Sequence, residues 1–167
     1  MKIEITRNNK EFKIIDKDTL ILKGHRPKWY SSEIRFFYNS KTYEIKKKGF
    51  WSTSFTVLEG GREIGAINWS LKTNYKITLK NTPSSLQYWL KKEQTGEWYA
   101  SDRKYILCEN GETPVLTIHY ALKKWKASMA SEFIDKDNAN YLLLICALFV
   151  MRLQQSAESA AASGGFS

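Results

Sequence analysis

An uninterrupted apolar run near the C-terminus, Tyr141 to Met151, is the sequence feature that most constrains the fold. A helix that is apolar on all sides is buried, either in a protein core or in a membrane. A membrane-spanning helix needs about 20 predominantly apolar residues. This run is shorter, and polar segments flank it at 135–140 and 152–155. The sequence therefore predicts a buried core helix from about Ala139 to Gln155, and no transmembrane span.

The chain before this run consists of short segments in which apolar and polar side chains alternate, as they do in half-buried strands. In Lys41–Lys47 and Tyr75–Lys80, Tyr, Ile and Leu share one face, and most of the Lys, Glu and Thr residues lie on the other. In Thr19–Lys23, Leu20 and Leu22 are expected to share a face. The aromatic content of 14% agrees with β-structure, because aromatic side chains pack well on pleated surfaces.

Short turns separate these segments. Asn39-Ser40, Gly60-Gly61 and Asn110-Gly111 each stand between two of them, and such residues accept the positive φ that tight hairpin turns require. Gln94-Thr95-Gly96 predicts one more hairpin, leading to a strand at Glu97–Ala100. Connections this short exclude parallel strands joined by crossover helices. The predicted fold is therefore mostly β: a closed antiparallel β-barrel of about twelve strands around a central hydrophobic C-terminal α-helix.

The 167 residues suit a single domain. We expect the barrel domain to cover residues 1–155, with the core helix at 139–155, and the Ala-, Ser- and Gly-rich segment 156–167 to be a disordered tail. Asp137 or Asn138 is expected to cap the helix, because their side-chain oxygens can accept hydrogen bonds from first-turn amides. An Asp at Leu144 or Leu148 should prevent folding, since it would bury an unpaired charge.

Two stretches carry a resemblance to a known superfamily. Gly60–Ile67, which reads Gly-Gly-Arg-Glu-Ile-Gly-Ala-Ile, looks like its turn followed by Gly-x-Ile, and Phe133-Ile134-Asp135 before Tyr141–Met151 looks like its last strand and core helix. In this layout the chain resembles the tubby C-terminal-like superfamily of tubby domains, phospholipid scramblases and LURP-one-related proteins. The resemblance implies a twelve-stranded barrel around a hydrophobic helix. Tubby domains bind phosphoinositides through basic residues, but no motif here matches that site, and Asp135-Lys136-Asp137 is not the calcium-binding segment of scramblases.

The formal net charge of +9 favours phosphate-bearing partners. Trp125 lies among lysines, as suits a membrane interface, where a Trp ring sits at headgroup depth. Each lysine near an anionic bilayer contributes about 1 kcal/mol. The alternative is a solvated basic face with one Trp covering a barrel seam. No recognition helix or RNA-binding aromatic motif supports a nucleic acid partner. The candidate anionic-lipid-binding residues are Lys46, Lys48, Lys123, Lys124, Trp125 and Lys126.

No arrangement of residues predicts an enzyme. In Asp16-Lys17-Asp18-Thr19, the two Asp residues have the spacing of the Asp-x-Asp motif of haloacid-dehalogenase phosphotransferases, but that chemistry needs an α/β sheet, so a polar turn is expected. Cys108 and His119 have no third group to orient them, and His119 is expected to face solvent. His25 has no metal partner at ligand spacing. We expect no catalytic residues, no metal and no cofactor.

These observations favour a non-enzymatic binding or scaffold module that docks on an anionic phospholipid (phosphoinositide) membrane or on a protein. The alternative is a lipocalin-like carrier of a small hydrophobic ligand, because a barrel interior can hold either a helix or a ligand. Two cysteines form no disulfide framework, and Cys146 is expected to be a small buried hydrophobe. With no apolar signal segment near Met1, a cytoplasmic location is expected, with peripheral membrane association if the lipid hypothesis holds.

Overall fold

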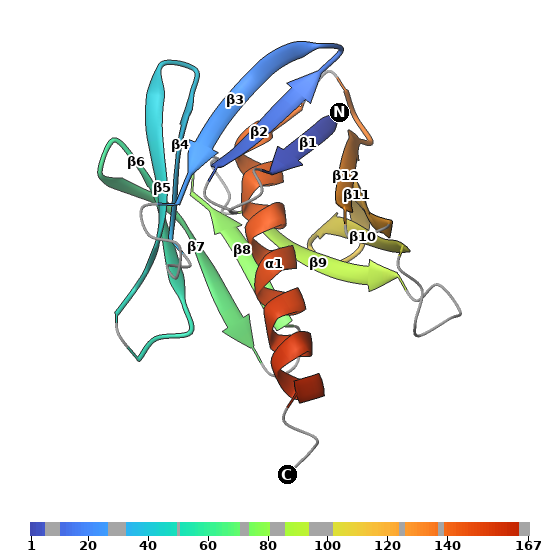
Figure 1. Cartoon of the computed structure of the whole chain (residues 1–167). Coiled ribbons are helices and arrows are strands. Elements are labelled where there is room, and N and C mark those ends of the chain that lie inside the picture. The colour runs from blue at the N-terminus through green and yellow to red at the C-terminus, as the bar shows by residue number, and fades with distance from the viewer. Residues whose placement is uncertain are drawn as a thin grey trace.

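The computed structural model of the chain describes residues 1–5, 11–26, 33–49, 51–70, 74–80, 86–93, 102–123, 126–136 and 139–163. Within these ranges, twelve antiparallel strands form a closed barrel around one C-terminal helix (Figure 1). The predicted fold class is confirmed. The hairpin expected at Gln94-Thr95-Gly96 and the strand expected at Glu97–Ala100 lie outside the described residues.

Each strand pairs with its neighbours in the chain, and β1 pairs with β12 to close the barrel. The closing register is short and covers Lys2↔Ala130 and Ile3↔Met129. The bounds are β1 (Lys2–Ile5), β2 (Glu11–Asp16), β3 (Thr19–His25), β4 (Ile34–Tyr38), β5 (Lys41–Lys47), β6 (Phe55–Glu59), β7 (Arg62–Ser70), β8 (Asn74–Leu79), β9 (Leu86–Glu93), β10 (Asp102–Glu109), β11 (Thr113–Lys123), β12 (Lys126–Phe133) and α1 (Tyr141–Ser163).

The hairpin turns follow the local chemistry of their residues. Positive φ angles occur at both residues of each predicted tight turn that the structure describes: Asn39, Ser40, Gly60, Gly61, Asn110 and Gly111. Lys17 and Asp18 also have positive φ, at 45° and 65°, between the end of β2 and the start of β3. The Asp16-Lys17-Asp18-Thr19 segment is therefore a hairpin turn, as expected.

Because the strands alternate in direction, their connections gather at two ends of the barrel (Figure 1). The turn end carries the turns at 17–18, 39–40, 60–61 and 110–112, and α1 begins there. At the opposite end, the exit end, β3, β5, β7, β9 and β11 finish and α1 leaves the barrel.

The predicted core helix fills the barrel. Every residue of α1 from Leu142 to Met151 is buried except Leu148, which is half-buried. The ring of Phe149 packs edge-on against Phe55 of β6, with centroids 4.9 Å apart. The window Tyr141–Ala160 is long and apolar enough to cross a membrane, but half of it is buried in the barrel. Packing in the core accounts for the apolar composition of this window. The composition is therefore weak evidence for a membrane-spanning helix.

The start of α1 differs from the prediction. Asn140 caps the helix, because its Oδ1 accepts a hydrogen bond from the amide of Leu143 at 3.1 Å. Asp137 and Asn138, the expected caps, lie outside the described residues. The asparagine nearest the apolar run takes the capping position because the helix begins only at Tyr141.

The end of α1 also corrects the prediction. The helix continues past Gln155 to Ser163, so the expected disorder of 156–167 is wrong for residues 156–163. Alanine has the highest helix propensity, which favours this continuation. Glu158 also ties the helix to the barrel wall through ion pairs with Lys92 at 3.0 Å and Arg103 at 2.7 Å. Residues 164–167 lie outside the described residues.

In β3, buried and exposed side chains do not alternate regularly along the strand. A register shift between Ile14 and Ile15 pairs Ile15 with Leu20 and Ile14 with Leu22. Leu22 is consequently buried, whereas Leu20 is 54% exposed. The expectation that Leu20 and Leu22 share a face is wrong, because a bulge adds one residue and reverses the side-chain direction.

Both cysteines are buried, as expected for Cys146. Burial raises the pKa of the Cys146 thiol to about 12, so almost no reactive thiolate forms near neutral pH. Because both thiols are buried, we expect neither cysteine to react with a thiol reagent at about pH 8 in the folded protein, and both to react in denaturant. Absorbance at the reagent's product band follows the reaction. Rapid labelling of one thiol without denaturant would contradict this packing.

Candidate functional site

The charges of the protein are unevenly divided between the two ends of the barrel. At the exit end, basic residues outnumber acidic ones. The basic residues in the described strands and connections are Arg26, Lys46, Lys47, Lys48, Lys92, Arg103, Lys104, Lys123 and Lys126, and the acidic ones are Glu11, Glu33, Glu93, Asp102 and Glu158. At the turn end, the acidic residues Asp16, Asp18, Glu59, Glu63, Glu109, Glu112, Glu132 and Asp135 slightly outnumber the basic residues Lys2, Lys17, Lys41, Arg62, Lys80, Lys136 and Lys91, whose ammonium group donates to the carbonyl of Gly111. The exit end therefore carries the positive charge.

The predicted lipid-binding residues lie on two opposite walls of the exit end. Lys46 and Lys48 lie at the end of β5. Lys123 ends β11 and pairs in register with Lys126 of β12. In strand order, β5 and β11 stand half the barrel circumference apart. Lys124 and Trp125 lie outside the described residues. The structure thus places the described residues on one rim, but not in one compact patch.

The β5–β6 connection adds an aromatic residue that the sequence reasoning missed. Trp51 lies in this connection and is 91% exposed. The amide of Lys48 donates to the carbonyl of Ser54 at 2.9 Å, which helps to hold the connection. Lys46 forms an ion pair with Glu44, so its charge is partly neutralised. A Trp soon after three consecutive lysines is the sequence pattern that could have identified this segment.

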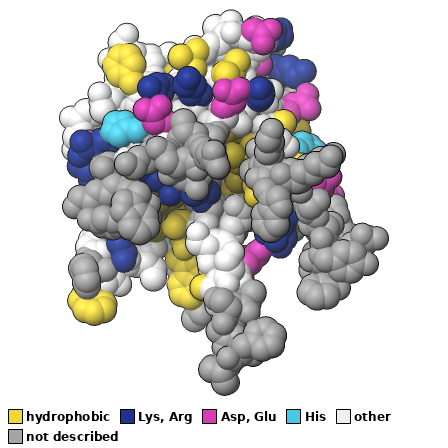
Figure 2. All heavy atoms as spheres, in the orientation of Figure 1, with side chains coloured by type: hydrophobic (Ala, Val, Ile, Leu, Met, Phe, Trp, Pro, Cys, Tyr) yellow, Lys and Arg dark blue, Asp and Glu magenta, His cyan; other side chains and the backbone are white. Residues whose placement is uncertain are grey.

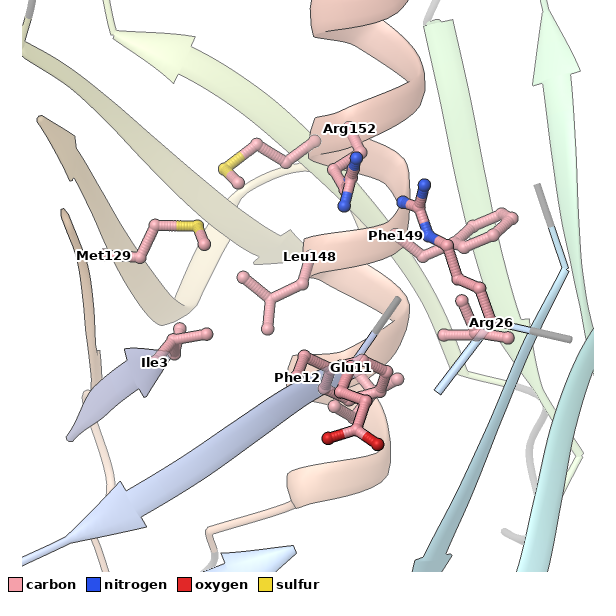
Figure 3. Close-up of a pocket in the computed structure, with 11 residues that line it drawn as sticks. Ile3, Glu11, Phe12, Arg26, Met129, Leu148, Phe149 and Arg152 are labelled. Carbon is pink, nitrogen blue, oxygen red and sulfur yellow. The ribbon is translucent and has the colours of Figure 1, made fainter. Parts of the chain in front are cut away.

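A small pocket of about 50 Å³ lies beside α1 (Figure 3). Ile3, Met129 and Leu148 are among its apolar lining residues, and Arg26 and Arg152 line it as well. Arg152 lies one helical turn after Leu148, on the same face of α1. The half-exposure of Leu148 shows that the barrel wall does not cover the helix completely here. The pocket borders the short β1–β12 register.

The two arginines of this pocket are partly desolvated like charges. Burial lowers the pKa of Arg26. Burial also lowers the pKa of Arg152 to about 10, and the charge of Arg26 acts in the same direction, against a smaller opposing effect of Tyr120. The two guanidinium groups lie near each other in Figure 3, consistent with this repulsion. An anion between them would relieve it.

No acidic side chain in the described ranges forms an ion pair with Arg26 or Arg152. Glu11 lines the same pocket, but its carboxylate points away from both guanidinium groups (Figure 3). This carboxylate pairs with Lys23 at 3.3 Å. The pocket therefore combines an apolar wall with positive charge that the described carboxylates leave uncompensated.

A wider groove of about 590 Å³ lies where α1 leaves the barrel. Trp69, Tyr75 and Trp89 line it, and Figure 2 shows hydrophobic side chains beside the emerging helix. Its lysines already have partners: Lys91 donates to the carbonyl of Gly111, and Lys92 pairs with Glu158. This groove therefore offers less uncompensated charge than the pocket lined by Arg26 and Arg152, called the arginine pocket below.

The structure does not bring the candidate catalytic residues together. Cys108 is buried in the barrel wall, whereas His119 is exposed. In the β10–β11 register, Cys108 lies opposite Pro114, and His119 lies opposite Lys104. Among the described residues, no group of three or more His, Cys, Asp or Glu side chains could hold a metal ion.

Comparisons with models of protein families, with characterised proteins and with solved structures found no match for this chain. A barrel architecture is compatible with many activities, because function depends on the residues of a site rather than on the fold. The features that bear on function lie at the exit end: the basic strand ends, the exposed Trp51 and the pocket of Arg26 and Arg152.

Proposed function

We propose that this protein is a non-enzymatic binding module of tubby-like fold that docks end-on, through its exit end, on anionic phospholipid membranes, including those with phosphoinositides. The observation that carries the proposal is that the exposed Trp51 and the basic strand ends share one rim. Trp side chains favour the membrane interface, and lysines are attracted to anionic headgroups. The twelve-stranded barrel around a hydrophobic helix supports the tubby-like part of the proposal.

The positions of the lysines favour an end-on approach. Lys48 and Lys126 stand on nearly opposite walls of the barrel but at the same end. A flat membrane that touched the side of the barrel would reach one of these walls, whereas a membrane across the exit end reaches both. A cytoplasmic protein that is recruited reversibly to a membrane surface fits this arrangement.

The carrier hypothesis receives less support. Sites for small molecules usually enclose about 300–1,000 Å³, and the core of this barrel is occupied by α1. The pocket beside Leu148 measures about 50 Å³. Carriage inside the barrel, as in a lipocalin, would require the helix to leave, at the cost of exposing its buried apolar residues. The groove of about 590 Å³ is large enough for a ligand, but it lies where α1 leaves the barrel and not in the barrel interior.

Vesicle flotation tests membrane docking. We expect the protein to float with phosphatidylcholine vesicles that contain a phosphoinositide, and to float less at about 0.15 M salt than at low salt, because salt screens exposed charges. Replacing Lys48 and Lys126 together with Glu should weaken binding at least about 30-fold, since two lysines contribute about 2 kcal/mol.

The control for this experiment makes the same change in charge at the turn end. Replacing Lys17 and Lys136, both exposed, with Glu should weaken binding less than about threefold if docking is end-on. Equal losses in the two double variants would point to attraction by net charge alone and would refute the end-on geometry. No flotation at low salt would refute membrane docking itself.

A further inference from the structure

The arginine pocket holds two positive groups that docking by exposed lysines does not require. Arg26 follows β3 at the exit end, and Arg152 comes from α1. Both are partly buried, and neither forms an ion pair with a described acidic residue. Burying like charges side by side is unfavourable unless an opposite charge joins them. This cost suggests that the pocket is complete only with an anion.

The chemistry of the two side chains narrows the class of anion. Guanidinium groups bind carboxylates and phosphates through two parallel hydrogen bonds. Two guanidinium groups together carry two positive charges, and a phosphate monoester carries about −1.5 to −2 at pH 7. A carboxylate carries only one negative charge. A phosphate monoester therefore compensates Arg26 and Arg152 more completely than a carboxylate does.

The walls of the pocket indicate what is attached to the phosphate. Ile3, Met129 and Leu148 give the pocket an apolar surface. Its volume of about 50 Å³ is small. One water molecule needs about 10–15 Å³, so the pocket holds about three to five groups of that size. A short stretch of hydrocarbon fits this space, whereas a complete acyl chain does not.

We propose that Arg26 and Arg152 bind the phosphate of a phosphate-monoester amphiphile, whose first carbon atoms occupy the apolar pocket beside Leu148. The monoester could belong to a membrane lipid such as phosphatidate or to a free alkyl phosphate. The proposal deepens the proposed function, because it names a headgroup recognised at the docking end. A soluble monoester can nevertheless fill the pocket whether or not the rim binds membranes.

Calorimetric titration with hexyl phosphate, below its micelle concentration, tests the site in solution. We expect hexyl phosphate to bind at least about tenfold more tightly than inorganic phosphate, from burial of about two methylene groups. Hexanol, which lacks the charge, should not bind measurably. Equal affinities for hexyl phosphate and inorganic phosphate, or no binding of hexyl phosphate, would overturn the proposal.

Variants separate the two halves of the pocket. Arg152→Met and Arg26→Met should each weaken hexyl phosphate binding at least about 30-fold, because a bidentate charged contact is lost. The affinity of Arg152→Lys for hexyl phosphate should fall between those of wild type and Arg152→Met, since lysine keeps the positive charge but cannot form the two parallel hydrogen bonds of a guanidinium group. Leu148→Phe should reduce hexyl phosphate affinity to that of inorganic phosphate. Arg62→Met, at an exposed turn-end position, is the matched control and should bind as wild type does.

Stability measurements separate loss of the site from loss of the fold. Without ligand, Arg152→Met should melt at or above the wild-type temperature, because it removes one of two repelling charges. A well-folded Arg152→Met variant that binds hexyl phosphate as wild type does would overturn the proposal.

Vesicles distinguish this proposal from membrane docking itself. Arg152→Met should keep salt-dependent binding to phosphatidylserine vesicles but lose any preference for phosphatidate. The variant with Glu at Lys48 and Lys126 should bind hexyl phosphate normally and fail to float. Wild-type binding of hexyl phosphate without a preference for phosphatidate vesicles would assign the site to a free monoester. Preference for phosphatidate that survives in Arg152→Met would contradict the assignment to this pocket.

Discussion

Leu144→Asp is expected to leave the chain unable to form its barrel. Leu144 lies in the centre of α1 and is 0% exposed. Truncating a buried Leu costs about 2–5 kcal/mol, and burying a carboxyl group without a partner costs several more, even if it becomes neutral. Together these costs approach the whole stability of a typical domain, about 5–15 kcal/mol. Circular dichroism and size-exclusion chromatography should show an unfolded or aggregated chain.

A conservative substitution at the same position provides the control. Leu144→Met keeps the volume and apolar character of the side chain and should cost less than about 1.5 kcal/mol. If Leu144→Asp instead unfolds cooperatively near the wild-type denaturant midpoint, α1 is not the core of the folded protein.

Leu148→Asp should behave differently, although the sequence alone predicts the same failure at both positions. Leu148 is half-buried beside Arg26 and Arg152. A carboxylate placed there would lie near two guanidinium groups that have no described acidic partner. The structure therefore revises the prediction for Leu148: the variant should fold, and its new negative charge should oppose phosphate binding in the pocket.

Gly65→Ala is expected to lower the free energy of unfolding by about 3 kcal/mol, as overpacking of a rigid site does. A Cβ at Gly65 would lie 2.5 Å from the backbone carbonyl oxygen of Thr78 and 2.9 Å from Cδ2 of Leu79. The side chain of Leu79 can move, but the Thr78 carbonyl belongs to the β7–β8 ladder. Relief of the contact requires these strands to separate, which urea denaturation should report as a lower midpoint.

The neighbouring Ala66 supplies a matched control. Its side chain lies on the opposite face of β7 and is only half-buried. Ala66→Val adds methyl groups to the same strand with a favourable β propensity and should change stability by less than about 0.5 kcal/mol. A loss below about 1 kcal/mol for Gly65→Ala would show that β7 and β8 approach less closely than the structure has it.

Local sequence patterns predicted most of the fold. Alternation in Lys41–Lys47, the turn residues Asn39-Ser40 and the apolar run Tyr141–Met151 each depend on side chains close together in the chain. Features that depend on interactions between distant segments were not predicted from these patterns. The bulge in β3 between Leu20 and Leu22 reversed the direction of Leu20, and the ion pairs of Glu158 with β9 and β10 hold the helix beyond Gln155.

In the candidate site as well, local patterns could be read from the sequence, whereas the arrangement of distant residues could not. The sequence indicated basic clusters and a Trp among lysines, but it could not show that Lys48 and Lys126 share one rim while standing on opposite walls. Trp51 was missed because exposure depends on what packs around a side chain. Arg26 and Arg152 form no pattern, since they come from segments that meet only when the helix enters the barrel.

The sequence by itself determined the fold class, an antiparallel barrel of about twelve strands, and the burial of the C-terminal helix. Hydrophobic period and turn chemistry act over a few residues, so they can be read along the chain. Only the tertiary structure decided which charges face each other, where the wall leaves Leu148 uncovered and which end of the barrel is basic. Electrostatic and packing energies depend on distances through space, and closure of the barrel sets those distances.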